Sequence, residues 1–148
     1  MDISIIIVNY NVKEFLQNLL QSIRKAVTGL GYEIIIVDNN SDDGSIEFIS
    51  EKFPDVKLII NSENLGFSKA NNIALKLAQG KYLLLLNPDT IVREDTFHEM
   101  INFFKTNSSA GLAGCKILNP DGTLQLACRR SFPGPWTSFC KVIGLSSL

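Results

Sequence analysis

Short runs of apolar residues alternate, along the first hundred positions, with longer stretches in which apolar residues recur every three or four positions. Four runs are continuous: ISIIIV at 3–8, EIIIV at 33–37, VKLII at 56–60 and KYLLLL at 81–86. Continuous runs of Ile, Val and Leu are typical of strands that are buried on both faces. We therefore predict four buried strands at these positions.

The stretches between and after these runs predict four helices, at 13–27, 43–53, 68–78 and 94–104. In the first of them, Phe15, Leu19 and Ile23 fall on one stripe of a helix. Repeated alternation of strand and helix predicts a mostly parallel sheet with helices on both faces. The expected class is α/β, in three layers.

The pattern changes after residue 107. AGLAGCKIL at 110–118 reads as a fifth strand, and NPDG at 119–122 is a turn signal with Pro second and Gly fourth. TLQLACRR should then return antiparallel. We expect one domain over 1–148, with a core at 1–118, a hairpin at 112–130 and an unfinished tail at 132–148.

Charge and cysteine content narrow the class of partner and the compartment. Fourteen basic residues against fifteen acidic ones give no electrostatic footprint for nucleic acid. The three cysteines are widely spaced and include no CxxC, which fits a reducing compartment. No run approaches the ~20 apolar residues that span a bilayer. We expect a cytoplasmic protein.

Polar residues follow three of the predicted strands directly. They are Asn9, Tyr10 and Asn11 after the first, the segment 38–45 after the second, and the segment 87–90 after the fourth. The carboxyl ends of parallel strands meet at one edge of the sheet, where open α/β folds bind ligands. The sequence therefore predicts one crevice lined by all three segments.

Each of these segments also has a local explanation. Ser41, Asp42 and Asp43 stand where the second helix begins, and we predict that they cap it. Asp38 comes before the cap, where its carboxylate should face the crevice and accept hydrogen bonds from ring N–H groups or hydroxyls of a ligand. Asp89 either caps the fourth helix or holds a divalent cation, and both interpretations stay open.

The segment NLGFSKANN at 64–72 runs through a turn into the third predicted helix. Gly66 permits the turn, Ser68 can cap, and the free amides of a helix start favour an anion. Many helix starts of this kind bind nothing, so the segment is informative only with the others.

Together these segments resemble the nucleotide-binding half of a family 2 glycosyltransferase, an inverting enzyme of the GT-A fold. The order VNYN, VDNNSDDGS, NLGFSKANN and LLLLNPDT is that of the family, and LLLLNPDT stands at the place of the metal-binding DxD motif. The segment 119–133 resembles the rhamnosyltransferase-like branch. The resemblance covers nearly the whole chain, and it implies transfer of a hexosyl or deoxyhexosyl group from a UDP-, dTDP- or GDP-sugar to an acceptor hydroxyl, in polysaccharide or glycolipid synthesis at the cell surface.

The resemblance also implies roles for individual residues. Asn9, Tyr10 and Asn11 would line the base pocket, Asp38 would hydrogen-bond the base, Asn64, Gly66, Asn71 and Asn87 would frame the donor, and Asp89 would bind Mg²⁺ or Mn²⁺. Such an ion stabilises the charge that develops on a diphosphate leaving group. Asn87 replaces the first acid of the motif, so the ion would rest on Asp89, the diphosphate and waters.

The acceptor half of the family carries an acidic general base on a later helix. No acidic residue follows Asp121, and we assign this role to none of Asp95, Glu99 and Asp121. We expect that the C-terminal acceptor half is missing, that this chain binds the donor with little or no transfer, and that its uncovered face favours a homodimer. His98 is expected on a helix surface. Arg129 and Arg130 are expected in solvent, and the alternative is that they face the diphosphate or the acceptor.

Two other classes of protein share part of this pattern. A signalling receiver domain has a similar size and alternation but needs paired acids after the first strand, where this chain has asparagines. A nucleotide-sugar binding module without catalysis is the second alternative, whereas the lack of GxGxxG and GxxxxGK[ST] disfavours a dehydrogenase and a P-loop enzyme.

The segment 136–148 has the pattern of an amphipathic helix that lies on a membrane surface. Trp136, Phe139, Val142 and Ile143 would form one apolar face of an interfacial helix. With the saccharide or lipid-linked acceptors that the resemblance implies, this predicts association with the inner face of the cell membrane.

Overall fold

The structure, a computed structural model, describes residues 1–125, 128 and 134–143. The chain divides into two compact units, Met1–Ser109 and Ala110–Leu148. Each unit is described by itself.

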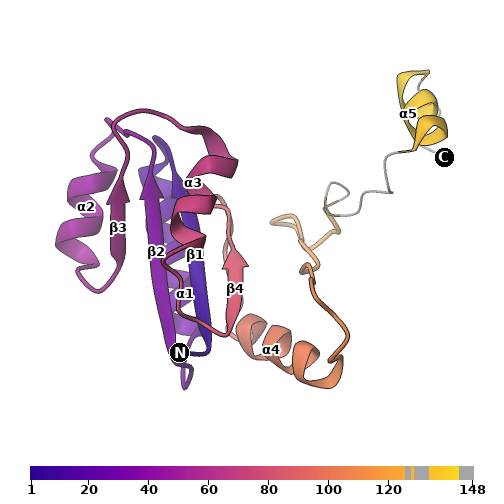
Figure 1. The fold of residues 1–148 in the computed structure, drawn as a ribbon, viewed down its shortest axis with the longest axis horizontal. Helices are drawn as coiled ribbons and strands as arrows, with labels where there is room; N and C mark the ends of the chain where they lie inside the picture. Colours follow the sequence, from indigo (N-terminus) through magenta and orange to yellow (C-terminus); the bar gives the residue numbers. More distant parts are fainter. Residues whose placement is uncertain (126–127, 129–133, 144–148) are drawn as a thin grey trace. The chain divides into compact units, whose positions relative to one another are not determined.

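The first unit alternates strands and helices from beginning to end (Figure 1). Its elements are β1 (Ile3–Asn9), α1 (Lys13–Ala26), β2 (Tyr32–Asp38), α2 (Ser45–Lys52), β3 (Lys57–Ile60), α3 (Gly66–Leu75), β4 (Tyr82–Leu85) and α4 (Thr96–Thr106). The four predicted strands and four predicted helices are confirmed. Their ends differ from the predicted ones by a few residues, and α3 already begins at Gly66.

The four strands form one parallel sheet in the order β3-β2-β1-β4. β1 lies between β2 and β4, so that Ile3 pairs with Tyr32 on one side and with Tyr82 on the other. The chain moves outward from β1 to β3, and α3 then carries it back across the sheet to β4. The direction of winding thus reverses between β1 and β4, which is the position where open α/β sheets bind ligands.

Helices cover both faces of the two central strands (Figure 1). On one face Ile5 and Ile7 of β1 belong to a core with Leu16, Leu19, Leu20 and Ile23 of α1, Ile49 of α2 and Phe97 of α4. On the other face Ile6, Ile35 and Val37 pack with Ala70 and Ala74 of α3. Successive residues of a strand point to opposite faces, which is why these runs are apolar throughout.

The prediction that the leucines of 83–86 are buried on both faces is wrong for β4. Leu84 and Leu86 pack with the α1 core, but Leu83 is 52% exposed and Leu85 is 47% exposed. The reason is topological. Within the described sheet β4 is an edge strand, and α3 packs on β1 and β2.

A polar clamp joins three segments at the amino edge of the sheet. The Ser4 hydroxyl donates to Glu33 and accepts from the Gly80 amide at 2.8 Å, and the Gln79 amide donates to the same Glu33 oxygen at 2.7 Å. A Cβ at Gly80 would lie 2.4 Å from the Ser4 nitrogen. Burial alone would raise the pKa of Glu33, but hydrogen bonds from Ser4 and Gln79 and the nearby charge of Lys57 lower it below its ordinary value. The clamp fixes the turn that leads into β4.

The second unit contains the predicted turn, but the strand predicted at 110–118 does not form, and most of the predicted return strand at 123–130 lies outside the described residues. The Gly122 amide donates to the Asn119 carbonyl at 2.9 Å, and a single antiparallel bridge pairs Leu118 with Leu124. No strand forms at 110–118, where two glycines weaken strand formation. The described part of this unit ends with α5 (Pro135–Val142), and Arg129 and Arg130 lie outside the described residues.

Candidate functional site

The structure brings the predicted polar segments to one edge of the sheet. Asn9 pairs with Asp38 at the ends of β1 and β2, and the Asn39 amide donates to the Asn9 carbonyl at 2.9 Å. On the other side of β1, the Leu86 amide donates to the Ile6 carbonyl, so the segment 87–90 leaves β4 at the same edge. The edge therefore carries the polar ends of three adjacent strands.

Asn9 and Asp38 form a buried polar pair at the centre of this edge. Both side chains are fully buried, and Asn9 Nδ2 donates to Asp38 Oδ2 at 2.6 Å and to the Ser41 hydroxyl at 3.1 Å. The other carboxylate oxygen accepts from the Ser41 amide at 2.8 Å. Asn9 Oδ1 is buried without a partner among the described residues. A buried acceptor of this kind carries a desolvation cost that a donor would remove.

This arrangement differs from the expectation that the Asp38 carboxylate faces the crevice. The side chain of Asp38 is buried in the protein. Its Oδ2 accepts a hydrogen bond from the Asn9 side chain, and its Oδ1 accepts one from the Ser41 amide. In this structure Asp38 orients Asn9 and the turn at Ser41. Hydrogen bonding between Asp38 and a nucleobase stays a prediction.

Two left-handed asparagines interlock the turns that follow β1 and β2. Asn11 has φ 54° and Asn40 has φ 66°, a region that asparagine tolerates better than most residues. The Asn11 amide donates to the Ser41 hydroxyl at 3.0 Å, and Asn11 Oδ1 accepts from the Asp42 amide at 2.9 Å. Tyr10, beside Asn11, is 48% exposed. Non-glycine residues in this region gather at functional sites, where the surroundings hold them.

Of the three residues predicted to cap the second helix, Ser41, Asp42 and Asp43, only Asp43 accepts a hydrogen bond from the start of that helix. Its Oδ1 accepts from the Ser45 amide at the start of α2, whereas the N-cap position itself is Gly44. Its Oδ2 accepts from the Lys13 amide at 2.8 Å, where α1 begins. Burial alone would raise the pKa of Asp43, but the hydrogen bonds from Ser45 and Lys13 lower it. Ser41, predicted as a cap, holds the β1–α1 turn instead.

Three asparagines connect the ends of β2 and β3 with the start of α3. Asn61 Nδ2 donates to Asn39 Oδ1 at 2.8 Å, and Asn39 Nδ2 donates to Asn64 Oδ1 at 3.1 Å. Asn64 Oδ1 also accepts from the Gly66 amide at 2.9 Å. Asn64 thus reaches the start of α3, and the role predicted for Ser68 as its cap is wrong because the helix begins before it.

Gly66 and Asn71 occupy different places on α3. Gly66 has φ 76°, so a side chain there would strain the backbone. Asn71 is 4% exposed and its Nδ2 donates to the Phe67 carbonyl inside the helix. The structure therefore joins Gly66, through Asn64, to the edge network and gives Asn71 a partner within its own helix.

Asn87 and Asp89 lie in the exposed turn after β4. Helix α4 begins at Thr96 with Asp95 at its N-cap position, so the interpretation of Asp89 as the cap of this helix is wrong. No hydrogen bond or ion pair within the described residues uses the Asp89 carboxylate, and no group of three metal-binding side chains is found among them. One accessible carboxylate fits Mg²⁺ or Mn²⁺ only together with waters and phosphate oxygens, which is how magnesium is commonly held.

His98 and Asp121 take no part in the hydrogen bonds described above. His98 is exposed on α4, as predicted. Asp121 accepts hydrogen bonds from the Thr123 hydroxyl and amide, which lower its pKa and make it a weaker base.

Sequence reasoning gave no individual role to Asn39, which lies in the predicted segment 38–45, or to Asn61, and it misplaced Ser41. The sequence signal, a polar residue at the end of a predicted strand, was present at both positions. Asn61 directly follows the predicted strand at 56–60, and Asn39 follows Asp38 after the predicted strand at 33–37. Their partners are set by which turns pack together, and no spacing in the sequence carries that information.

Known proteins resemble this chain in sequence. The model of the family described as Glycosyl transferase family 2 matches residues 4–139. The minor teichoic acid biosynthesis protein GgaB of Bacillus subtilis (strain 168) is 36% identical over 108 residues, 70% of this chain and 12% of the relative. A dolichol-phosphate mannosyltransferase of Pyrococcus furiosus is 32% identical over 115 residues, 76% of this chain and 32% of the relative. The chain thus spans less than half the length of these relatives.

Solved structures share the fold. The crystal structure of residues 1–349 of S. aureus TarS with UDP has a TM-score of 0.66 at 24% identity, over 73% of this chain and 33% of that one. The mannosyltransferase PcManGT from Pyrobaculum calidifontis, in complex with GDP-Man and Mn²⁺, has a TM-score of 0.59 at 23% identity, over 69% and 32%. These likenesses confirm the predicted α/β fold of the GT-A type.

Proposed function

Since the chain belongs to glycosyl transferase family 2, we propose that it binds a nucleoside diphosphate sugar at the carboxyl edge of its sheet and provides the donor-binding part of an inverting sugar transfer. The observation that carries this proposal is the meeting of the polar ends of β1, β2 and β4 where the winding of the sheet reverses. The base and ribose would lie over Asn9, Tyr10 and Asn11, and the diphosphate would extend toward Asp89.

Asp89 would hold a divalent cation against the diphosphate. A bound Mg²⁺ or Mn²⁺ supplies charge stabilisation to a diphosphate leaving group. The accessible carboxylate of Asp89 supports this role, and Asn87 would contribute a neutral oxygen beside it. We propose that the nucleotide and the ion bind together, because one carboxylate with waters gives a weak site by itself.

Titration calorimetry of UDP, dTDP and GDP into the 148-residue chain tests donor binding. We expect one nucleotide to bind with Mn²⁺ and to lose most of its affinity with EDTA or in Asp89→Ala. Glu51→Ala, an exposed acid on α2, is the control because it removes the same charge away from the edge. A folded chain that binds none of the three nucleotides refutes the proposal, and equal loss in both variants refutes the role of Asp89.

The acceptor is proposed from the relatives. Their names refer to teichoic acid, to dolichol phosphate and to poly-β-1,6-N-acetyl-D-glucosamine. We propose a saccharide or lipid-linked acceptor hydroxyl in the synthesis of a cell-surface polymer. The proton of that hydroxyl needs a general base, and we assign none within residues 1–148.

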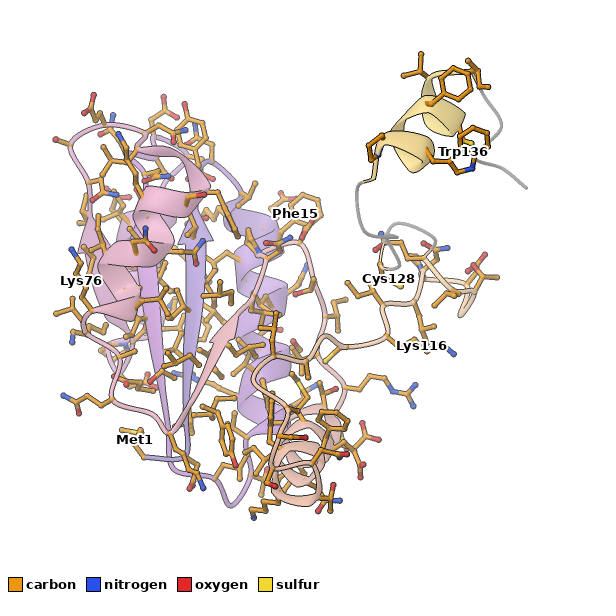
Figure 2. The ribbon with its side chains drawn as sticks, turned by 45° about the vertical axis from the view of Figure 1, so that its right-hand side comes forward. Met1, Phe15, Lys76, Lys116, Cys128 and Trp136 are labelled. Carbon is orange, nitrogen blue, oxygen red and sulfur yellow. The ribbon has the colours of Figure 1, made fainter. Side chains whose placement is uncertain are left out.

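A cytoplasmic location at the membrane surface is proposed from α5. The exposed apolar residues Trp136 (Figure 2), Phe139, Val142 and Ile143 recur at helical spacing. The rings of Trp136 and Phe139 stack with centroids 5.8 Å apart. Residues 122–148 contain three basic residues and no acidic one. Such segments suit an anionic bilayer surface. None of the described helices is both long and apolar enough to cross a bilayer.

Flotation with vesicles of phosphatidylcholine and phosphatidylglycerol tests this association. Wild type should float with vesicles that contain the anionic lipid, less so at high salt, and Trp136→Ala should lower the bound fraction severalfold. The control is Phe15→Ala, which removes an exposed ring from α1 in the other unit (Figure 2). Equal flotation of wild type and Trp136→Ala would exclude α5 as the contact.

A further inference from the structure

The side chain of Asn39 links three segments of the candidate site through two hydrogen bonds. It is 2% exposed, it follows β2 directly, and its carboxamide lies between Asn61 and Asn64. Neither the sequence pattern nor the family resemblance gives this residue a role.

The direction of these hydrogen bonds follows from one fixed donor. The Gly66 amide can only donate, so the atom of Asn64 that it contacts is the oxygen Oδ1. The atom of Asn39 that faces this oxygen must then be Nδ2, and its Oδ1 faces the donor of Asn61. A flipped carboxamide at Asn39 would place its Oδ1 against Asn64 Oδ1.

The network fixes the loop that leads from β3 into α3. The backbone adds one more link, because the Asn61 amide donates to the Asp38 carbonyl at 2.9 Å. The loop is otherwise open, since Asn64 and Gly66 are exposed and a Cβ at Gly66 would meet nothing within 4 Å. The position of this loop relative to Asn9 and Asp38 therefore depends on the carboxamide of Asn39.

We propose that Asn39 is a positioning residue for the donor site, which holds Asn64 and the first turn of α3 in place beside the ends of β1 and β2. This inference rests on the proposed binding of a nucleoside diphosphate at that edge. Asn39 itself is buried and acts through Asn64, so its effect should appear in the affinity for the nucleotide.

Asn39→Asp is the sharpest test because the two side chains have nearly the same shape. A carboxylate still accepts from Asn61 but presents an oxygen to Asn64 Oδ1, so one hydrogen bond becomes a repulsive contact. Asn61→Ala is the second variant, since it removes the other hydrogen bond at a position that is only half-buried. Ser4→Ala is the control, because it removes buried hydrogen bonds of the same kind at the opposite edge.

The experiment measures the melting temperature of each variant and its affinity for UDP, dTDP and GDP with Mn²⁺. If such a hydrogen bond is needed to hold the loop in its binding position, its net contribution corresponds to at most about a tenfold change in affinity. We expect Asn39→Asp to weaken nucleotide binding about tenfold and Asn61→Ala to weaken it to a smaller degree. Ser4→Ala should lower the melting temperature without changing the affinity.

The possible results separate the two proposals. Wild type that binds none of the three nucleotides refutes donor binding itself. Wild type that binds, with unchanged affinity in both Asn39→Asp and Asn61→Ala, refutes the positioning role alone. The positioning role is also refuted if Ser4→Ala and Asn39→Asp lower the melting temperature equally and weaken nucleotide binding equally. The loss of affinity would then follow from the loss of stability.

Discussion

The coupling between Asn9 and Asp38 can be measured with a double-mutant cycle of Asn9→Ala, Asp38→Ala and the double variant. Asn9→Ala removes the donor of the 2.6 Å hydrogen bond and leaves a buried carboxylate oxygen without a partner. Hydrogen bonds to charged groups contribute about 1.5–3 kcal/mol, and an unsatisfied buried group costs about 1–3 kcal/mol. We expect each single substitution to lower the free energy of unfolding by about 3 kcal/mol.

The double variant removes both partners, so it should cost about 2 kcal/mol less than the sum of the two single costs. Urea unfolding followed by far-ultraviolet circular dichroism measures these differences, because the only tryptophan, Trp136, lies in the second unit. With a slope of about 1–3 kcal/mol per molar urea, a coupling of this size shifts the midpoint by about 1 M. Additive costs within about 0.5 kcal/mol would refute the reasoning, since they would mean that the two side chains do not stabilise each other.

Three further predictions concern the frame of the site. The pKa of Glu33 is lowered in the folded state, so its contribution to stability is present above its ordinary pKa of about 4.3 and is lost as the pH falls through the folded value. The difference in melting temperature between wild type and Glu33→Gln should therefore shrink in acid, and a difference that stays constant with pH would contradict this. Gly80→Ala should lower the melting temperature by about 10 °C or more, because its Cβ would overlap the backbone of Ser4. Gly111→Ala is the control and should leave the melting temperature unchanged, because its Cβ would meet nothing within 4 Å. Equal melting temperatures of the two variants would show that the backbone around Ser4 moves to accept the added methyl group. Asp43→Ala should lower the free energy of unfolding by about 1–2 kcal/mol in chemical denaturation, since the starts of α1 and α2 both lose an acceptor, and an unchanged midpoint would exclude that role.

The sequence was sufficient for the order of elements because each signal is local. The run IIIV in β1 is apolar on both faces and is buried on both faces, so pattern and environment agree. The same reasoning failed for LLLL in β4, since the order of strands decides whether a run has neighbours on both sides. A continuous apolar run does not encode its own position in the sheet.

The candidate site was predictable as a place and much less so as a set of contacts. Strand ends identified Asn9, Asp38 and Asp89, because parallel strands bring their carboxyl ends to one edge. Which of these side chains turn inward depends on partners far away in the sequence. Asp38 is buried because Asn9 and Ser41 donate to it, and that pairing becomes visible only when the turns are packed together.

The central position of β1 has a consequence for the order in which the protein assembles. Ile3 pairs with Tyr32 and with Tyr82, so the pairing with β4 closes a much longer loop. Loop-closure entropy makes the longer loop about 0.9 kcal/mol more costly, before the helices between the strands are considered. We expect β4 to join last, and pulse-labelling hydrogen exchange should show the Leu86 amide protected after the Asn39 amide; simultaneous protection would contradict this order. The part of the site on β1 and β2 would then form first, and Asp89 would reach it as the final component.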